Sequence, residues 1–227
     1  MNILAIETST KTFSLAVMKN NKIVKHRQIV LKKVLSSSII PAIDKILKAS
    51  QLALEKLDGF AVGLGPGSFT SLRVGLSTIK GLAFATGKPI VGIPSLDALA
   101  LNVAEEVDGD ICTISDAKRQ LVYGCIYEHQ NGNMKPHSDY MLMPIVEILA
   151  RLKGKTLFVG DAIGLYREMI IQQCPQAIFA DEKKWLPQAK AVGLLALERF
   201  KTKKFDDIDR LVPLYLYPAD CQVQRTK

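Results

Sequence analysis

The predicted order of secondary structure repeats once along the 227 residues of this chain. Short apolar runs bounded by turn residues predict strands, and apolar residues at helical spacing predict helices. In the first half these are strands at 3–8, 13–18, 22–31, 60–64 and 90–93 and helices at 36–50, 69–86 and from Ser95 onward. In the second half they are strands at 110–115, 121–127, 134–142, 156–160 and 177–180 and helices at 144–151, 162–173 and 188–200. Both halves read βββαβαβα, so we predict a duplicated α/β fold with mixed sheets.

The repeat also sets the expected domain organisation. We expect an N-terminal lobe at 1–107 and a C-terminal lobe at 108–227, and leave open whether the last segment packs back on the first lobe. Two ribonuclease-H-like lobes of this order resemble the ground plan of the actin-like, sugar-kinase and heat-shock ATPase (ASKHA) superfamily, although a fold alone does not define an activity. A single open α/β domain is the alternative.

Composition places the chain among compact globular proteins. With 48% hydrophobic and 23% charged residues, it can build a core without disulfides or metals. Glu7 interrupts the early apolar stretch, and no window is long enough to span a bilayer, so we expect no secretory signal and no membrane partner. The spacing of Cys112, Cys125, Cys174 and Cys221 matches neither a zinc site nor a disulfide scaffold. We therefore expect a cytoplasmic protein with free thiols.

Positive charge is concentrated in the first half of the chain. The net charge is +8, and residues 1–107 hold 13 Lys and Arg against 7 Asp and Glu, compared with 17 against 15 in the remainder. A cluster in this half contains no aromatic residue and consists of Lys22, Lys25, Arg27, Lys32 and Lys33. Such a cluster suggests proximity to RNA without reading of its sequence, but a merely solvated face is the interpretation that we favour at this point.

The most specific string in the chain is GLGPGSFTSLRVGLSTIKGLAFA at residues 63–85. Together with ILAIETST, IIPAID, PIVGIPSLDALA, SDAKR and PLYLYP, it resembles the TsaB (YeaZ) family over nearly the whole chain. That family comprises bacterial tRNA threonylcarbamoyladenosine biosynthesis proteins, which are paralogues of the catalytic TsaD subunit and were once grouped as M22 glycoprotease-like. The matched motif consists of Gly65, Pro66, Gly67, Ser68, Phe69, Thr70 and Arg73.

Several positions depart from the family pattern. Glu7 stands where the family usually has Asp, Ser71 where it has Gly, and Lys118 where it has Arg, and a common His is missing around Leu35 to Ser38. The apolar skeleton is untouched by these changes. The resemblance therefore supports the family fold for this chain more strongly than it supports any particular functional residue.

The glycine loop permits two readings. Its place between a strand and a helix would allow backbone N–H groups to bind an anion. It is not a P-loop, because no Lys-Ser/Thr pair follows, and it is not G-x-G-x-x-G, because Ser68 replaces the third glycine. We favour the structural reading, in which Gly65 and Gly67 provide positive φ for a tight turn and close helix packing.

No metal or nucleophile pattern is present in the sequence. His26, His129 and His137 include no pair at i and i+4, and we expect all three on the surface. The resemblance implies that such a pair marks the catalytic paralogue. Glu7 and Asp116 end the first strands of the two lobes, where an ASKHA enzyme would place magnesium and phosphate, and in the alternative reading Asp116 stabilises a turn through backbone amides. G-x-S-x-G is also absent, which argues against a protease with a serine nucleophile.

The resemblance implies a non-catalytic scaffold subunit. It would support a TsaD-like catalytic paralogue, act with a TsaE-like ATPase and reach tRNA through the complex. Metal and nucleotide would then reside in the partners, with no cofactor in this chain. An ATP-dependent ASKHA enzyme, either kinase or hydrolase, is the alternative, and a peptidase is a third possibility.

Two helices of the first lobe are expected to bind the partner, or a second copy when the partner is missing. They carry more apolar residues than one core-facing stripe requires, and Ser71, Gly75 and Thr78 form a stripe of small residues. The expected interface residues are Ile39, Ile43, Leu72, Gly75, Leu76 and Ile79. On this view Gly75→Trp should block assembly and leave the fold intact.

Overall fold

The first lobe is built on a five-stranded sheet of order β3-β2-β1-β4-β5. The computed structural model describes residues 1–31, 34–130 and 132–217. Three strands form an antiparallel meander and two further strands continue the sheet in parallel with β1. They are β1 (Ile3–Glu7), β2 (Thr12–Lys19), β3 (Lys22–Val30), β4 (Gly59–Gly63) and β5 (Ile90–Ile93). β1 lies at the centre, and all five of its residues are buried.

The second lobe repeats this plan around a sheet of order β11-β10-β6-β7-β8. Its strands are β6 (Gly109–Lys118), β7 (Leu121–Gln130), β8 (Asn133–Pro136), β9 (Met141–Met143), β10 (Thr156–Val159) and β11 (Ala177–Phe179). The single strand predicted at 134–142 is wrong. Two short strands replace it, because β8 pairs with the end of β7 and β9 with its beginning.

Six α-helices are found in the described part of the chain. They are α1 (Leu35–Ala49), α2 (Phe69–Thr86), α3 (Ser95–Leu101), α4 (Ile145–Leu149), α5 (Ile163–Gln173) and α6 (Ala189–Lys201). Short 3-10 turns occur at η1 (Leu54–Lys56), η2 (Ala104–Glu106) and η3 (Glu182–Lys184). The first half therefore has the predicted βββαβαβα order, the second half has it with the third strand divided into β8 and β9, and the duplicated α/β fold is confirmed. None of the described helices combines the length and apolar character needed to cross a bilayer.

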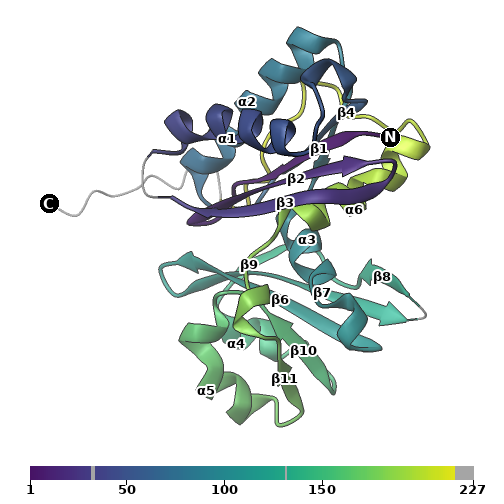
Figure 1. The fold of residues 1–227 in the computed structure, drawn as a ribbon. Coiled ribbons are helices and arrows are strands. Elements are labelled where there is room, and N and C mark those ends of the chain that lie inside the picture. Colours follow the sequence, from purple (N-terminus) through teal and green to yellow (C-terminus); the bar gives the residue numbers. More distant parts are fainter. Residues whose placement is uncertain (32–33, 131, 218–227) are drawn as a thin grey trace, which may run out of the picture.

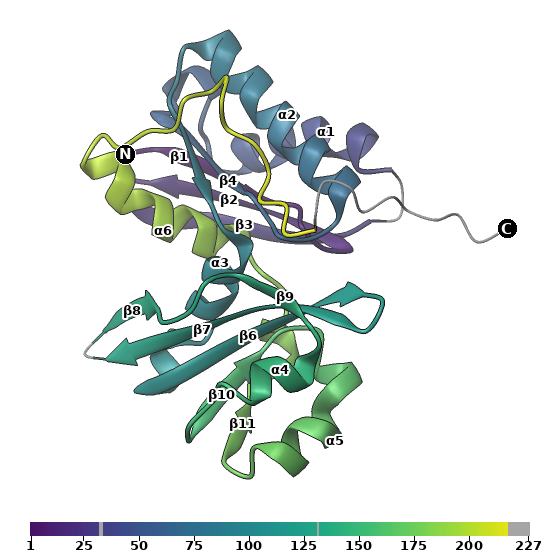
Figure 2. The same ribbon diagram turned by 180° about the vertical axis from the view of Figure 1, so that it is seen from behind.

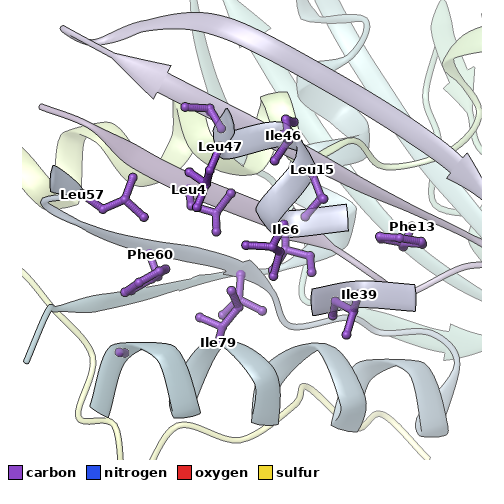
Figure 3. Packing of buried hydrophobic residues seen from close by; sticks show 14 of the residues in the cluster. Leu4, Ile6, Phe13, Leu15, Ile39, Ile46, Leu47, Leu57, Phe60 and Ile79 are labelled. Carbon is purple, nitrogen blue, oxygen red and sulfur yellow. The ribbon is translucent and has the colours of Figure 1, made fainter. Parts of the chain in front are cut away.

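α1 and α2 cover one face of the first sheet (Figure 1). Every third or fourth residue of α1 points to this face, and its buried residues are Leu35, Ile39, Ile43, Ile46 and Leu47. They meet side chains of β1, β2 and β4 in a continuous apolar core, part of which Figure 3 shows. Burial of large aliphatic side chains of this kind contributes about 1.5–3 kcal/mol each before the loss of chain entropy.

The opposite face of the first sheet is covered by α6, which comes from the far end of the sequence (Figure 1). Gly193 permits this contact, since a Cβ there would lie 2.9 Å from the Met18 sulfur. α3, which follows β5, contributes Leu96 and Leu99 to the core of the second lobe. The last helix of the first half thus packs on the second sheet and the last helix of the second half packs on the first.

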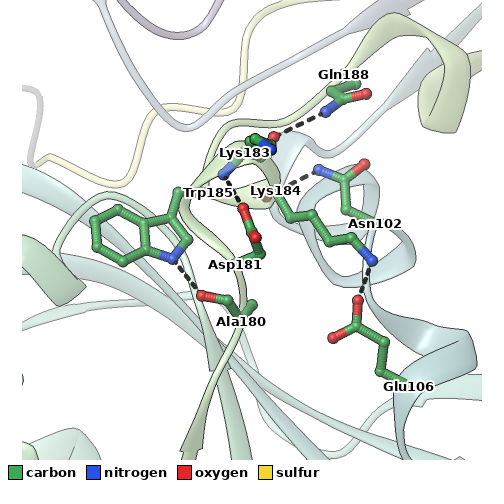
Figure 4. A network of polar contacts seen from close by, with 8 residues as sticks. All are labelled: Asn102, Glu106, Ala180, Asp181, Lys183, Lys184, Trp185 and Gln188. Carbon is green, nitrogen blue, oxygen red and sulfur yellow. Dashed lines mark hydrogen bonds and ion pairs between the residues drawn. The ribbon is translucent and has the colours of Figure 1, made fainter.

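The segment that leads into α6 is tied to the end of α3 (Figure 4). The Asn102 amide donates to the carbonyl oxygens of Lys184 and Leu186, at 3.2 and 2.9 Å, and Lys184 forms an ion pair with Glu106. These contacts join the two helices that connect the lobes.

Residues 202–217 form a C-terminal strap that returns along α2 (yellow in Figure 2). Asp206 bridges to Ile90 of β5, and the Leu214 N–H donates to the Leu64 carbonyl at 2.8 Å. The Tyr217 hydroxyl then donates to the Ala117 carbonyl in the second lobe, also at 2.8 Å. The strap therefore contacts both lobes.

Candidate functional site

A cleft between the lobes collects polar side chains from the carboxyl ends of the central strands. Its volume is about 410 Å³. The first lobe lines it with Ser9, Thr10, Lys11 and the glycine loop, and the second lobe with the end of β6, Tyr123, Asp161 and Leu165. Strand ends of α/β sheets are a common place for ligands, so this cleft is the candidate site.

Glu7 lies at the buried end of β1 beneath the cleft. Its Oε1 accepts from the Ser9 N–H at 2.7 Å, and its Oε2 accepts from the Ser95 hydroxyl at 2.8 Å. Burial raises the pKa of Glu7, and the hydrogen bonds from Ser9 and Ser95 oppose this increase. Ser95 also accepts from the Gly65 N–H at 3.0 Å, so the carboxyl group connects β1, α3 and the glycine loop.

The glycine loop is held against the turn that joins β1 to β2. Gly65 has φ +90°, as the sequence predicted. The same expectation for Gly67 is wrong, because its φ is not positive and it is needed for close approach: a Cβ there would lie 2.2 Å from the Ser9 carbonyl oxygen. That oxygen also accepts from the Ser68 N–H at 2.7 Å. The loop therefore has a packing role in this chain.

The other residues of the family motif lie around the start of α2, and one of them, Arg73, contacts the strap. Thr70 is exposed, and Pro66 is buried. The Arg73 guanidinium lies 3.8 Å from the centre of the Phe69 ring, and its Nε donates to the Tyr215 hydroxyl at 3.0 Å. The Tyr215 contact could not be found from the sequence, because 142 residues separate the two side chains.

On the second-lobe side of the cleft, polar groups close together in the sequence bind one another. The Lys118 N–H donates to Asp116 Oδ1 at 2.8 Å and the Lys118 ammonium binds Asp116 Oδ2, so the turn-stabilising reading of Asp116 is confirmed. Burial alone would raise the pKa of Asp116, but the hydrogen bonds from Lys118 outweigh it and the pKa is lowered. Lys118, Arg119 and Gln120 all have positive φ, in a turn without glycine.

Asp161 is a cleft residue that the sequence analysis missed. It follows β10, and its Oδ1 accepts from the Asp116 N–H at 3.0 Å. Burial raises the pKa of Asp161, the neighbouring Asp116 charge adds to this increase, and Lys11 opposes it. The one signal for this residue in the sequence is the glycine directly before it, Gly160. The structure shows why a glycine is needed there, since a Cβ would lie 1.9 Å from the Ile114 carbonyl oxygen.

The three histidines lie on separate elements. His26 is on β3, and His137 is an exposed residue between β8 and β9. His129 on β7 is buried, with Nδ1 2.6 Å from the Val107 carbonyl oxygen, so its expected surface position is wrong. Within residues 1–31, 34–130 and 132–217, no group of three or more His, Cys, Asp or Glu side chains could hold a metal ion.

Three cysteines are free thiols, and two of them are buried. Cys112 and Cys125 lie inside the second lobe, whereas Cys174 is partly exposed. Burial raises the pKa of the Cys112 thiol, which disfavours the reactive thiolate. Cys221, Lys32 and Lys33 lie outside the described residues.

The side chains predicted to bind a partner are inside the first lobe instead. Ile39, Ile43, Leu72, Leu76 and Ile79 are at most 5% exposed, and all but Leu72, which lies beside Gly65, belong to the core below α1 and α2. Gly75 is also buried, and a Cβ there would lie 2.3 Å from Thr8 Oγ1. The expectation that Gly75→Trp keeps the fold is therefore wrong, because the indole would have to displace the end of β1. These six residues shape the helix pair from within, and any contact surface of the pair must use other side chains.

Comparison with known proteins decides the family. The family model described as "TsaD: tRNA N6-adenosine threonylcarbamoyltransferase" matches residues 28–222. The "tRNA threonylcarbamoyladenosine biosynthesis protein TsaB" of Bacillus subtilis is 31% identical over 228 residues, which cover 99% of this chain and 97% of that protein. The chain belongs to the TsaB family.

Solved structures agree with this TsaB assignment at the level of the fold. "YeaZ from Pseudomonas aeruginosa" superposes with a TM-score of 0.80 at 24% identity, covering 95% of this chain and 99% of that one. The activator of 2-hydroxyisocaproyl-CoA dehydratase from Clostridium difficile, solved with bound ADPNP, gives a TM-score of 0.51 at 12% identity, covering 95% of this chain and 100% of that chain. The second likeness shows a shared architecture only.

Proposed function

We propose that this chain is a non-catalytic subunit of the machinery that transfers a threonylcarbamoyl group to the adenosine beside the tRNA anticodon. The observation that carries the proposal is the match to the Bacillus subtilis TsaB protein over 99% of the chain. In this proposal the chain acts in the cytoplasm, binds a TsaD-like catalytic paralogue and works with a TsaE-like ATPase. Metal and nucleotide belong to those partners.

Two features of the cleft support a binding role over catalysis. The end of β6 and the turn that follows it contain no glycine through which a phosphate could approach the backbone, and Asp116 and Lys118 at this end bind one another. The Ala117 carbonyl at the end of β6 accepts from the Tyr217 hydroxyl of the strap. These residues do not fit a nucleotide site, so we assign no chemical step to them.

The outward face of α1 and α2 is the surface we assign to the partner. Ile40 is 50% exposed and Phe84 is 82% exposed, which is unusual for side chains of this size. Gly81 lies on the exposed side of α2, with nothing within 4 Å of where its Cβ would be. A helix pair of the same fold could pack across this face, and a second copy of the chain could do so when the partner is missing.

Reconstitution by omission tests the proposed function. Purified chain, TsaD-like subunit and TsaE-like ATPase are mixed with unmodified tRNA and threonylcarbamoyl-adenylate, and modified adenosine is measured by mass spectrometry. We expect product from the full mixture, little or none when this chain is omitted, and none from this chain alone. Full activity without the chain would contradict the proposal.

A pair of substitutions at Gly81 tests the partner surface. Gly81→Trp should abolish binding to the TsaD-like subunit by steric exclusion, whereas Gly81→Ala should bind normally and raise stability by about 0.5–1 kcal/mol, since Ala is the better helix former. Calorimetric titration measures the binding, and circular dichroism verifies the fold. Parental affinity in a folded Gly81→Trp variant would place the interface elsewhere.

An ATP-dependent enzyme remains the second candidate, favoured by the cleft volume and by Asp161 at its edge. It predicts ATP turnover by the homogeneous chain that disappears in both Glu7→Ala and Asp116→Ala. We expect no such turnover, and no peptide cleavage, from the isolated chain.

A further inference from the structure

The positive charge of this chain is carried almost entirely by one segment. Residues 8–43 contain seven Lys and Arg and no Asp or Glu, while the other 191 residues contain 23 cations and 22 acids. The acids on either side cannot neutralise the segment. Glu7 is buried with a raised pKa, and Asp44 is bound to Lys48 at 2.8 Å.

The sheet register brings four of these cations to one face. β2 and β3 pair Lys19 with Lys22, Val17 with Lys25 and Leu15 with Arg27. Paired residues of an antiparallel ladder point to the same face, and alternate residues of one strand do so as well. Leu15 and Val17 belong to the core beneath α1 and α2, so Lys19, Lys22, Lys25 and Arg27 all lie on the α1 side of the sheet.

A β-bulge makes this alignment possible. Lys22 and Lys25 are three positions apart, so a regular strand would direct them to opposite faces. The register shifts between Val17 and Met18, which pair with Lys25 and Ile23 and leave Val24 as the extra residue. Ile23 accordingly packs on the α6 side, where Met18 also lies. Bulges often redirect side chains in this way for a function.

These cations are left without counter-charges in the part of the chain that the structure describes. Lys22, Lys25 and Arg27 are exposed and Lys19 is partly exposed, and none of the ion pairs found there involves them. Lys19 and Lys22 even face each other directly, an arrangement that costs stability. β3 is also the edge strand of its sheet (Figure 1), and no further strand of the described residues pairs with its outer side.

We infer that this cation face, defined as Lys19, Lys22, Lys25 and Arg27, binds the phosphate backbone of a folded RNA. This inference rests on the proposed function, which brings tRNA to the complex. The face contains no aromatic side chain on which a base could stack, so the contacts are to phosphates and carry no sequence information. Its place on the side of the sheet that α1 covers puts it beside the surface assigned to the catalytic partner, where an RNA could contact both subunits.

The test compares two triple variants with the same change in net charge. Lys22→Gln/Lys25→Gln/Arg27→Gln removes three cations of the face, and Lys153→Gln/Lys155→Gln/Lys183→Gln removes three exposed lysines of the second lobe. Each variant is assembled with the TsaD-like subunit, and its affinity for unmodified tRNA is measured by fluorescence anisotropy across a salt series. Assembly is measured separately by size-exclusion chromatography and stability by thermal unfolding.

We expect the first variant to reduce the slope of log affinity against log salt by about two to three, because each phosphate contact contributes about 0.7–0.9. The control should keep the parental slope, and both variants should assemble, with the melting temperature of the first equal to or above the parental value. Equal slopes in both variants would overturn the inference, as would loss of assembly in the first, which would assign the face to a protein partner. These readouts need no product, so failure of the proposed function would appear separately, as absence of modified adenosine from the wild-type mixture.

Discussion

The Glu7 side chain organises the residues beneath the cleft, because it is long enough to reach two hydrogen-bond donors and because its carboxyl group is buried. Its carboxyl group reaches both the Ser9 N–H and the Ser95 hydroxyl, and Gly63 passes so closely that a Cβ there would lie 1.9 Å from Oε2. A buried carboxyl group held on both oxygens is fixed in position, but its negative charge is poorly solvated. The protonated form is therefore favoured by folding.

The stability of the chain should depend on pH through this group. The pKa of Glu7 is raised above its ordinary 4.5 in the folded state, so the stability contributed by its protonated form is fully present below 4.5 and is lost as pH rises through the folded-state value. Glu7→Gln removes this dependence and leaves Asp97 and Asp161 in place. The melting temperature of the wild type relative to Glu7→Gln should rise as pH falls from about 8 towards 4.5. A difference that stays constant across this range would contradict the assignment.

Gly75 and Gly81 on the same helix should respond oppositely to alanine. At Gly75 the new methyl group meets the buried Thr8 side chain at 2.3 Å, whereas at Gly81 it enters open space. Gly75→Ala should lower the free energy of unfolding by about 1–3 kcal/mol through overpacking, and Gly81→Ala should raise it by about 0.5–1 kcal/mol. Urea unfolding of the two variants measures both. Stabilisation by both would show that Thr8 yields without cost.

For single residues, features that depend on neighbours in the sequence could be predicted, whereas contacts with distant segments could not. The positive φ of Gly65 and the turn at Asp116 depend on neighbouring residues and were predictable. The approach of Gly67 to Ser9 and of Arg73 to Tyr215 depends on segments 58 and 142 residues away in sequence. The burial of the six predicted interface residues was missed for the same reason, since periodicity gives an apolar face but not what covers it.

Among the elements, α3 makes the connections between the lobes. Its first residue, Ser95, binds Glu7, and Asp97 in its first turn accepts from the Tyr127 and Tyr140 hydroxyls of the second lobe at 2.7 and 2.8 Å. Asn102, just beyond its end, holds the carbonyls before α6. A helix of seven residues thus contacts both lobes along its whole length, and the strap adds the hydrogen bond from Tyr217 to Ala117.

Substitution of Asp97 should separate the role of its acceptor oxygen from that of its charge. Asp97→Ala leaves two tyrosine hydroxyls without an acceptor and should cost about 2–4 kcal/mol of unfolding free energy. Asp97→Asn keeps an oxygen at the same place and should cost less than about 1 kcal/mol, because burial already raises the pKa of the aspartate and disfavours its charge. Chemical denaturation compares the two, and equal losses would mean that the hydroxyls find other acceptors.

Element positions were predictable where clear stop signals bound an apolar pattern, such as Gly87 and Pro89 between α2 and β5. The sequence placed α2 at 69–86 and the β5 strand at 90–93, and the structure has the same bounds. The region after β7 failed, because its strands are short and two partners compete along β7. The bulge in β3 was also beyond the sequence, since a period of two gives no sign of one inserted residue.

The two lobes of the folded molecule do not coincide with the two halves of the sequence. The sequence boundary at 107/108 separates the two sheets, but α6 and much of the strap lie on the first sheet, where Ala191, Val192 and Phe200 complete the core opposite α1 and α2. α3 does the reverse, because its apolar side chains complete the second lobe. Each sheet therefore has one face covered by a helix from the other half.

The exchange of helices predicts that the lobes do not fold separately. A fragment of residues 1–107 lacks α6, so the face of the first sheet formed by Ile3, Ala16 and Met18 would be left in water, and such an exposed apolar surface favours aggregation. Joining residues 186–217 to this fragment through a flexible Gly/Ser linker restores α6 and the strap, and the joined chain should show one cooperative urea transition. The matched control joins the same segment with Val192→Asp, which places a charge in the α6 contact and should abolish the transition. If residues 1–107 alone unfold cooperatively with the same midpoint as the joined chain, α6 adds nothing to the first lobe and the sequence boundary is also the physical one.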